Sequence, residues 1–421
     1  MADILILTPQ LPYPPQQGTS LRNFHIICGV AQAHTVTLLS FLEAGQTAVP
    51  DQIAPLAALC EQIVTVPVPP RSTQQRLAQL AATRRPDMAH RLYSPDFDVK
   101  LNQLLGERPF DIVQVEGIEL ARYMTTIRAA SPSSRIVFDD HNAEAELQRR
   151  NMLTDVRQPR RWAAAGYSWF QVQRLRHFER WAMQTADATV AVSETDKRFL
   201  EELFYGAPLT PADHRILNTE HRSPITVIPN SIDTKQFTAY DGPSLPFDLV
   251  FSGKMDYRPN VDAALWFADA VWPMIKQARP STTWAIVGQK PHSRLARLGQ
   301  LDGVTVTGWV ESVRPYLAGA KVYIMPFRVG SGTRLKLIES MAAGKAIVST
   351  RIGAEGFPVT AGQELLLADG AVEMGTAVLR LLDHPEERQR LGQNAQQFAQ
   401  QYDWRVVIPR FDELYAALLQ T

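Results

Sequence analysis

The feature that most constrains the fold is an alternation of short apolar runs with longer amphipathic segments along the chain of 421 residues. The runs are rich in Val and Ile, as buried strands are, and several of the segments between them space their apolar residues three or four apart, as helices do. This alternation is typical of parallel sheets covered by helices. The predicted strands are residues 4–7, 35–41, 63–66, 112–115, 136–138, 189–192, 225–228, 249–252, 284–287, 304–306, 322–325, 346–349 and 365–367.

A stretch typical of a linker divides these strands into two series. Residues 236–247 contain Tyr240-Asp-Gly-Pro-Ser-Leu-Pro246, a run of turn-forming residues. About 200 residues on each side are enough for an independent core. We therefore expect an α/β chain with two Rossmann-like, doubly wound domains, residues 1–235 and 248–402, followed by an amphipathic helix over residues 403–421.

The overall charge is balanced, with 43 basic and 43 acidic side chains, which argues against a dedicated nucleic-acid binder. Cys28 and Cys60 lack the neighbouring ligands of a zinc or redox motif, so we interpret both as buried thiols in a reducing cytoplasm. The first residues, with Asp3 ahead of a short apolar run, predict a strand rather than a signal peptide. No window offers the roughly 20 apolar residues that span a bilayer. We expect a cytoplasmic protein.

The stretch richest in chemistry joins a predicted strand to a helix in the second half. Gly330 and Gly332 let the backbone approach a ligand closely, and the amides that open the following helix form an anion site. Arg334 and Lys336 add two cations that can balance the charge of a departing nucleotide diphosphate. Glu339 follows on the same helical face as Lys336. The alternative is that Lys336 and Glu339 form a surface ion pair and that the glycines only shape a loop.

Two other strand ends carry polar residues. Gly253 and Lys254 follow the first strand of the second series, at the edge where open α/β sheets bind their ligands, although Lys254 alone reads better as an exposed loop lysine. In the first half, Asp139, Asp140 and His141 crowd the end of a strand. His141 can position or deprotonate an acceptor hydroxyl, or it can be structural. A metal site that includes Asp139 and His141 stays open, with its remaining ligands unidentified.

Together these segments resemble the retaining glycosyltransferases of family 4. That family has the GT-B fold, in which two Rossmann-like domains face each other across a cleft and a C-terminal helix crosses back to the first domain. The agreement covers nearly the whole chain and follows the family's order. Its segments are the N-terminal loop that ends at Gly18, Asp139-Asp-His-Asn142, Ala188-Thr-Val-Ala-Val-Ser193, Val227-Ile-Pro-Asn-Ser-Ile-Asp233, Gly253-Lys254, Val304-Thr-Val-Thr-Gly-Trp-Val310 and Leu337-Ile-Glu-Ser-Met-Ala-Ala-Gly344.

The resemblance implies that the first domain binds an acceptor and the second a nucleotide-sugar donor. It places Glu339 against the ribose hydroxyls, Trp309 and Val310 near the base, and His141 near the reacting sugar. The catalytic residues that it implies are His141, Lys254, Arg334 and Lys336. The donor-binding residues that it implies are Gly18, Gly253, Trp309, Val310, Gly330, Ser331, Gly332, Thr333 and Glu339.

Two positions depart from the family's pattern. Many members carry two glutamates eight positions apart, but the residue eight positions before Glu339 is Ser331. The lysine that is common near position 260 is also absent, because Asn260 stands there. We expect Arg334 and Lys336 to supply the missing charge, as in members with the pattern Gly-x-Gly-Thr-Arg-x-Lys-x-x-Glu.

The resemblance further implies that the chain transfers a hexose-type sugar, with retention, from a UDP- or GDP-sugar to a glycan or lipid-linked acceptor in cell-surface polysaccharide or glycoconjugate synthesis. No metal ion, other cofactor or nucleic acid is expected to take part. Two alternatives stay open. One is an epimerase or hydrolase of nucleotide sugars on the same frame, and the other is a non-catalytic sugar-nucleotide-binding protein, for which Ser331 in place of glutamate leaves room.

One segment suggests a further partner. Residues 149–180 contain eight arginines and two acids, with Trp162, Tyr167, Trp169 and Phe170 among them. This composition suits peripheral docking on anionic lipid at the inner face of the cytoplasmic membrane, within reach of a lipid-linked acceptor. It equally suits a solvated helix pair that packs its aromatic residues inward.

Overall fold

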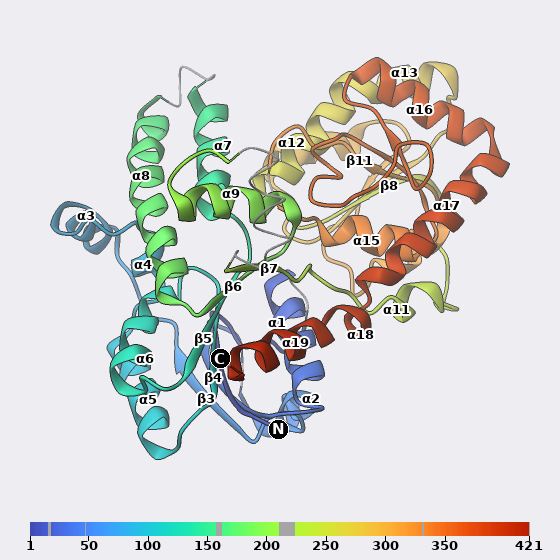
Figure 1. The fold of residues 1–421 in the computed structure, drawn as a ribbon. Coiled ribbons are helices and arrows are strands. Elements are labelled where there is room, and N and C mark those ends of the chain that lie inside the picture. The colour runs from blue at the N-terminus through green and yellow to red at the C-terminus, as the bar shows by residue number, and fades with distance from the viewer. Residues whose placement is uncertain (16–17, 47, 157–161, 210–223, 331, 421) are drawn as a thin grey trace. The chain divides into compact units, whose positions relative to one another are not determined.

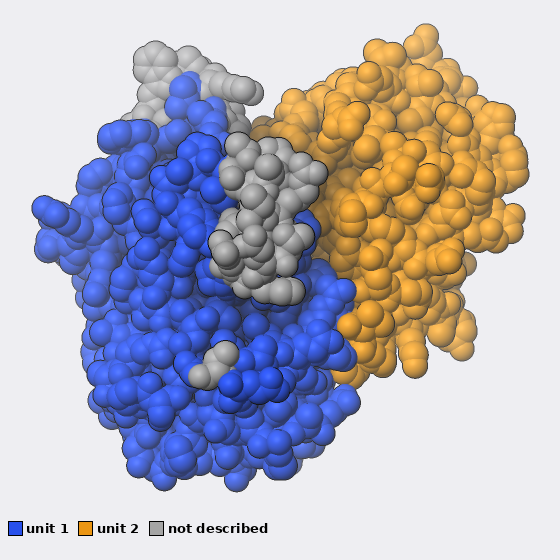
Figure 2. All heavy atoms as spheres, in the orientation of Figure 1, with its two compact units in different colours: residues 1–231, 407–421 blue, residues 232–406 orange. Residues whose placement is uncertain are grey.

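A computed structural model of the chain describes residues 1–15, 18–46, 48–156, 162–209, 224–330 and 332–420. The chain divides into two compact units, which Figures 1 and 2 show as a ribbon and as spheres. The first unit comprises residues 1–231 and 407–421, and the second comprises residues 232–406. Each unit contains a parallel sheet with helices packed against it, so the predicted α/β class is confirmed.

The sheet of the first unit has the strand order β3-β2-β1-β4-β5-β6-β7, and every strand predicted in this half is present. Its strands are β1 (Asp3–Thr8), β2 (Thr35–Leu42), β3 (Gln62–Pro67), β4 (Ile112–Glu116), β5 (Arg135–Asp140), β6 (Ala188–Ala191) and β7 (Ile225–Val227). The order of the strands reverses between β1 and β4. The loops that follow these two strands therefore diverge, and polar residues at their ends are accessible to a ligand.

Helices cover this sheet and connect its strands. They are α1 (Gly18–Val30), α2 (Ala54–Ala57), α3 (Thr73–Ala82), α4 (Met88–Arg91), α5 (Pro95–Glu107), α6 (Met124–Ala130), α7 (Glu144–Val156), α8 (Trp162–Thr185) and α9 (Glu194–Tyr205). Helices α7 and α8 pack against each other as a hairpin (Figure 1). These helices provide the connections that a parallel sheet requires, because the chain must cross from the end of one strand to the start of the next through a helix or a long loop.

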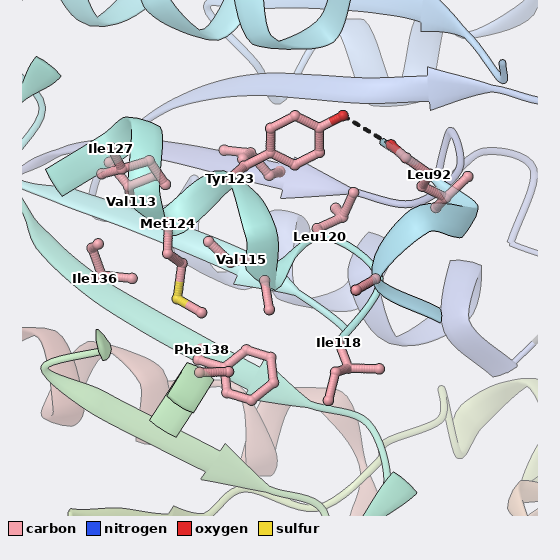
Figure 3. Close-up of a cluster of buried hydrophobic side chains, with 14 of the residues drawn as sticks. Leu92, Val113, Val115, Ile118, Leu120, Tyr123, Met124, Ile127, Ile136 and Phe138 are labelled. Atoms are coloured by element: carbon pink, nitrogen blue, oxygen red, sulfur yellow. Dashed lines mark hydrogen bonds between the residues drawn. The ribbon is translucent and has the colours of Figure 1, made fainter. Parts of the chain in front are cut away.

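Apolar side chains of β4, β5 and α6 fill part of the core of the first unit (Figure 3). Val115, Phe138 and Met124 are fully buried there. Tyr123 lies in the same cluster, and its hydroxyl donates a hydrogen bond of 2.8 Å to the backbone oxygen of Leu92. Because both faces of the central strands are buried, their apolar runs are nearly continuous, which is why these strands are predictable from sequence.

The sheet of the second unit has the order β10-β9-β8-β11-β12-β13, and all the strands predicted in this half are present. They are β8 (Phe247–Ser252), β9 (Trp284–Val287), β10 (Val304–Val306), β11 (Ala320–Met325), β12 (Ala346–Ser349) and β13 (Leu366–Leu367). The helices are α11 (Lys235–Thr238), α12 (Arg258–Trp266), α13 (Trp272–Ala278), α14 (Arg314–Gly319), α15 (Leu335–Ala342), α16 (Ala371–Asp383) and α17 (Pro385–Ala399). The strand order here reverses between β8 and β11.

The chain passes between the units twice, at residues 231–232 and 406–407. Residues 236–247, expected as the linker, lie inside the second unit. Asp403 holds the two crossing segments together within that unit, since its carboxylate accepts hydrogen bonds from the backbone N–H of Thr234 at 3.0 Å and from its hydroxyl at 2.6 Å.

The C-terminal helix expected over residues 403–421 is divided into α18 (Trp404–Val407) and α19 (Pro409–Leu419). Pro409 has no amide hydrogen to donate to the preceding turn, but it fits the first position of a new helix. The second helix packs beside α1 in the first unit (Figure 1).

The two cysteines, expected as buried thiols, are free and half-buried. Burial nevertheless raises the pKa of Cys28 to about 11 and that of Cys60 to about 12. Both thiols therefore stay protonated and unreactive near neutral pH.

Candidate functional site

In the second unit, the reversal of strand order brings together predicted site residues from two separate parts of the sequence. Strands β8 and β11 are hydrogen-bonded neighbours, and the loops at their carboxyl ends leave the same edge of the sheet. Gly253 and Lys254 follow β8, while Gly330 and Gly332 lie between β11 and α15. In open α/β sheets this edge, at the reversal, is where ligands bind.

Lys336 lies at the centre of this edge. Its Nζ donates a hydrogen bond of 2.7 Å to the backbone oxygen of Ser252 and another of 2.8 Å to Oδ1 of Asn260. The same nitrogen is 5.2 Å from the ring centres of both Phe251 and Phe327. Burial lowers the pKa of Lys336 to about 7, even though the carboxylate of Glu339 opposes the shift. The amine therefore gains or loses its proton near neutral pH, and a nearby anion favours the protonated, charged form.

Asn260 joins the loop after β8 to the start of α15. Its side-chain Nδ2 donates a hydrogen bond of 2.8 Å to the backbone oxygen of Lys254, and its Oδ1 accepts the one from Lys336. The side chain is buried. The amine of Lys336, on α15, therefore lies beside Asn260, the position at which the lysine common in the family pattern is absent. The side chain of Lys254 itself is exposed.

Close backbone approach explains two of the glycines at this edge. Gly253 and Gly288 have φ values of +153° and +152°, and a Cβ on Gly288 would lie 1.7 Å from the backbone oxygen of Gly253. Only glycine fits such a contact. Gly330 and Gly332 also have positive φ values, +122° and +76°, in the loop before α15.

Arg334 helps to shape that loop. Its guanidinium donates hydrogen bonds to the backbone oxygens of Gly332, at 3.2 Å, and Ile352, and it lies 4.8 Å from the ring centre of Phe327. The arginine therefore contributes to the loop's conformation as well as to its charge. Thr333 beside it is half-buried. Ser331, where the family pattern has glutamate, lies outside the described residues.

Glu339 is half-buried one turn beyond Lys336 in α15. In the described part of the chain, no residue forms a hydrogen bond or ion pair with its carboxylate. The surface ion pair between Lys336 and Glu339 is therefore not formed. Burial raises the pKa of Glu339, and the charge of Lys336 opposes this shift. Its oxygens are available to accept hydrogen bonds from a ligand.

Trp309 and Val310 follow β10 at the same edge of the sheet. The indole of Trp309 is 70% exposed, while Val310 is half-buried. Thr307, two residues earlier, accepts a hydrogen bond of 3.3 Å from the backbone N–H of Gly288, which ties this loop to the one after β9. An exposed aromatic ring on a fixed loop is suited to stacking on a planar ligand.

In the first unit, His141 follows β5 and Glu116 ends the neighbouring strand β4. The Nε2 of His141 lies 2.8 Å from Oε2 of Glu116, whose side chain is fully buried. Burial alone would lower the pKa of His141, but the hydrogen bond to Glu116 and the negative charges of Asp139 and Glu116 outweigh it, so this pKa is raised. The side chain of His141 is 16% exposed, and Gly117 beside it carries no Cβ, which would lie 3.6 Å from Nδ1 of His141.

Asp139 is paired with a residue that sequence reasoning missed. Arg22 of α1 donates two hydrogen bonds of 2.9 Å to its carboxylate, and both side chains are buried. Arg22 also donates to the backbone oxygens of Ile228 and Pro229, at 3.1 Å and 3.0 Å. The pair thus links α1, β5 and the segment after β7, and Asp139 has a structural role.

The metal site left open above does not fit this geometry. Ligand atoms of Glu116, Asp139 and His141 do lie within 4.8 Å of one another. However, both oxygens of Asp139 accept from Arg22, and an oxygen of Glu116 accepts from His141. A guanidinium already supplies the positive charge, so these residues do not offer a set of free ligands.

The other acids at this strand end form a separate buried cluster. Neither oxygen of Asp140 has a hydrogen-bond donor in the described part of the chain. Glu179 of α8 lies beside it and accepts a hydrogen bond of 2.7 Å from the backbone N–H of Glu144, at the start of α7. Burial raises the pKa of both Asp140 and Glu179. The two carboxyl groups therefore hold protons at a pH where exposed acids are ionised.

Gly18, expected beside a diphosphate, is the exposed first residue of α1. Arg22, Glu116 and Asn260 were not predicted to lie in a site. The sequence contains a signal for two of them, because Arg22 is the one Lys or Arg in α1 and Glu116 is the one charged residue in β4.

Each of the two units contains a doubly wound parallel sheet, and in the second unit loop glycines and Lys336 meet where the strand order reverses. This is the architecture of the GT-B glycosyltransferases. The comparisons with known proteins agree. Residues 30–236 match the family described as Glycosyltransferase Family 4, and residues 246–384 match the family described as Glycosyl transferases group 1. The chain belongs to the group 1, family 4-like glycosyltransferases.

Curated relatives match parts of the chain. A phosphatidyl-myo-inositol mannosyltransferase of Mycolicibacterium smegmatis is 27% identical over 45% of this chain and 50% of its own length. An MMP alpha-(1->4)-mannosyltransferase of Mycolicibacterium hassiacum is 34% identical over 29% of this chain and 31% of its own length. The matched regions thus span half or less of these relatives.

Solved structures match the chain over nearly its full length. Sucrose-phosphate synthase of Thermosynechococcus elongatus has a TM-score of 0.71 at 16% identity and covers 99% of both chains. HepE of Anabaena, solved in complex with UDP, has a TM-score of 0.64 at 14% identity and covers 99% of this chain and 100% of its own. At these identities the similarity concerns the fold.

Proposed function

We propose that this protein transfers a hexose-type sugar, with retention, from a UDP- or GDP-sugar to a glycan or lipid-linked acceptor in cell-surface polysaccharide or glycoconjugate synthesis. The observation that carries the proposal is the meeting of Lys336, the loop glycines and the unpaired carboxylate of Glu339 at the reversal of the second sheet. The mannosyltransferases among the relatives, and HepE with UDP and with UDP and glucose, support a nucleotide-sugar donor.

In this proposal the diphosphate binds against Gly253 and Gly330, and Lys336 and Arg334 balance the charge that grows on the leaving group. Glu339 accepts hydrogen bonds from the ribose, and Trp309 stacks on the base. His141 in the first unit holds or deprotonates the acceptor hydroxyl. The reaction needs no metal ion, because side-chain cations and backbone amides supply the positive charge.

The first experiment is a calorimetric titration of the protein with UDP and with GDP. We expect one of them to bind, and Glu339→Ala to weaken that binding by about tenfold, the effect of losing one or two hydrogen bonds to charged groups. Asp241→Ala, which changes an exposed acid of the same unit, is the control and keeps the affinity. Unchanged binding in Glu339→Ala would remove Glu339 from the donor site.

Transfer itself separates the proposal from its two alternatives. A transferase consumes the matching nucleotide sugar faster when an acceptor is present, and NMR of the product shows an unchanged anomeric configuration. An epimerase or hydrolase forms product without an acceptor. A binding protein retains nucleotide affinity but forms no product with any acceptor.

We also propose that the hairpin of α7 and α8 contacts an anionic membrane. Tyr167, Trp169 and Phe170 on α8 are 42%, 57% and 40% exposed, so these aromatic residues do not pack inward. Leu153 and Val156 on α7 are also exposed. Within the described residues, no helix combines the length and apolar character needed to cross a bilayer. Residues 157–161, which include three of the arginines, lie outside the described residues.

Flotation with vesicles tests this contact. We expect the protein to bind vesicles that contain anionic lipid and to bind neutral vesicles far less, and Trp169→Ala to reduce the bound fraction. Equal binding to both kinds of vesicle would contradict the electrostatic part of the proposal.

A further inference from the structure

A buried series of hydrogen bonds connects the C-terminal helix α19 to His141 within the first unit. The hydroxyl of Tyr415 donates to Oε1 of Gln114, and Nε2 of Gln114 donates to Oε1 of Glu116. The other oxygen of Glu116 accepts from Nε2 of His141 at 2.8 Å. Tyr415, Gln114 and Glu116 are fully buried, so water does not compete for these bonds.

We propose that Glu116, Gln114 and Tyr415 are positioning residues that fix the orientation and the protonation of His141, which makes α19 part of the apparatus that sets the reactivity of that histidine. The proposal deepens the proposed function, on which its catalytic consequence rests. The hydrogen-bond series itself is a property of the first unit.

The direction of each hydrogen bond is determined by its neighbours. A tyrosine hydroxyl that donates to Oε1 of Gln114 leaves the amide NH₂ to face Glu116. Without that hydroxyl, Oε1 of Gln114 loses its donor, so the amide that donates to Glu116 is less polarised and less firmly held. A weaker bond from the amide stabilises the ionised carboxylate of Glu116 less.

The ionisation of Glu116 then determines which nitrogen of His141 carries a proton. Burial and the charge of Asp139 raise the pKa of Glu116, while His141 and Arg22 oppose this. An ionised Glu116 holds the proton on Nε2 of His141, so that Nδ1 is the nitrogen that exchanges a proton with a ligand. The charges of Asp139 and Glu116 raise the pKa of His141, and the charge of Arg22 opposes them less strongly. Glu119 lies nearby as well, since a Cβ on Gly117 would lie 3.2 Å from its Oε2 and 3.6 Å from Nδ1 of His141. Glu116 is the group that hydrogen-bonds the ring, so the series acts on His141 through it.

Titration of His141 by NMR in the full chain tests the proposal without any substrate. Histidine labelled with ¹³C gives a signal for each ring, and loss of one signal in His141→Gln assigns it. We expect Tyr415→Phe to lower the pKa of His141 by about one unit, a tenfold loss of proton affinity, and Glu116→Gln to lower it further. A pKa of His141 that is the same in Tyr415→Phe and in the native protein would overturn the proposal.

Tyr123→Phe is the matched control. The hydroxyl of Tyr123 is also buried in the first unit, where it donates to the backbone oxygen of Leu92 at 2.8 Å (Figure 3). It also accepts a hydrogen bond of 2.8 Å from the backbone N–H of Ser94. It does not join the series that ends at His141. We expect this variant to lose stability comparably but to leave the pKa of His141 unchanged. An equal shift of that pKa in both variants would mean that general loosening of the core is responsible.

A transfer assay separates this proposal from the proposed function. If transfer occurs, Tyr415→Phe moves the pH profile of kcat and leaves the KM for the donor nearly unchanged, whereas Tyr123→Phe moves neither. If no donor yields product, the proposed function fails, and the NMR titration still decides whether the series governs His141.

Discussion

The side-chain nitrogen of Lys336 lies 2.8 Å from Oδ1 of Asn260, although the two residues are 76 positions apart. The pair brings a cation from α15 to the end of β8, beside the buried asparagine that holds the loop of Lys254. Lys336 is thus placed at the candidate diphosphate site by a contact with a residue that itself carries no charge.

The first prediction concerns the proton on Lys336. Burial holds its pKa at about 7, so at pH 8 the amine is mostly neutral in the free protein. A bound diphosphate favours the charged form and raises this pKa. We expect binding of the matching UDP- or GDP-sugar at pH 8 to take up close to one proton, measured by calorimetry in buffers of different ionisation enthalpy.

Two variants control this measurement. Lys336→Gln removes the titrating group, so it should bind more weakly and take up no proton at this site. Lys336→Arg keeps a permanent charge, since arginine does not deprotonate in proteins, and should bind without proton uptake. Proton uptake that persists in Lys336→Gln would assign it to another group.

A second prediction tests the close approach of Gly288 to Gly253. Gly288→Ala would place a Cβ 1.7 Å from the backbone oxygen of Gly253, at a φ of +152°. We expect it to destabilise the second unit by more than about 2 kcal/mol, from steric overlap and backbone strain together. Urea unfolding measures this loss, and nucleotide affinity should fall with it.

Gly106→Ala is the matched control for that substitution. Gly106 lies near the end of α5, and nothing lies within 4 Å of a Cβ built there. Alanine should raise stability by roughly 0.5–1 kcal/mol, because it reduces the entropy of the unfolded chain. A Gly288→Ala protein as stable as the native one would show that β8 and β9 do not approach this closely.

A third prediction distinguishes two exposed tryptophans. Trp309 is 70% exposed and Trp169 is 57% exposed, so neither contributes much to folding. Trp309→Ala should weaken nucleotide binding by about 1–3 kcal/mol, the size of a base-stacking contact, and leave vesicle binding unchanged. Trp169→Ala should do the reverse. Calorimetry and flotation on both variants decide, and a loss of nucleotide affinity in both would contradict the assignment.

A fourth prediction concerns pH and stability. Asp140 and Glu179 have raised pKa values in the folded chain, Glu179 at about 7 against 4.5 for an ordinary glutamate. The native state therefore binds protons that the unfolded chain releases, and this contribution to stability is lost as the pH rises from about 4.5 through about 7. Asp140→Asn supplies a donor to Glu179 and should raise Tm at pH 8 more than at pH 5.5.

Glu107→Gln, an exposed acid on α5, is the control for that comparison and should change Tm equally at both pH values. Calorimetric scans of the three proteins at the two pH values make the measurement. If Asp140→Asn lowers Tm most at pH 8, Asp140 is ionised and stabilising there, which contradicts the prediction.

Local sequence determined the strands of both sheets and the glycine loop before α15. Strands such as β1 and β11 are predictable because their central residues are buried on both faces of the sheet and form an apolar run, Ile4–Leu7 in β1 and Val322–Met325 in β11. Gly330 and Gly332 are readable because they stand between a strand and a helix. These features depend on neighbours within a few positions, and a single sequence displays such neighbours directly.

The tertiary structure alone decided which polar groups meet. Tyr415 reaches Gln114 across 301 positions, and His141 reaches Glu116 across 25, because strand order places the ends of β4 and β5 side by side and α19 packs back on the first unit. The ion pair of Lys336 with Glu339, which the sequence left open as an alternative, is not formed, and Lys336 bonds Asn260 instead for the same reason. A hydrogen bond depends on distance and direction in space, and the spacing of residues along the chain does not contain either.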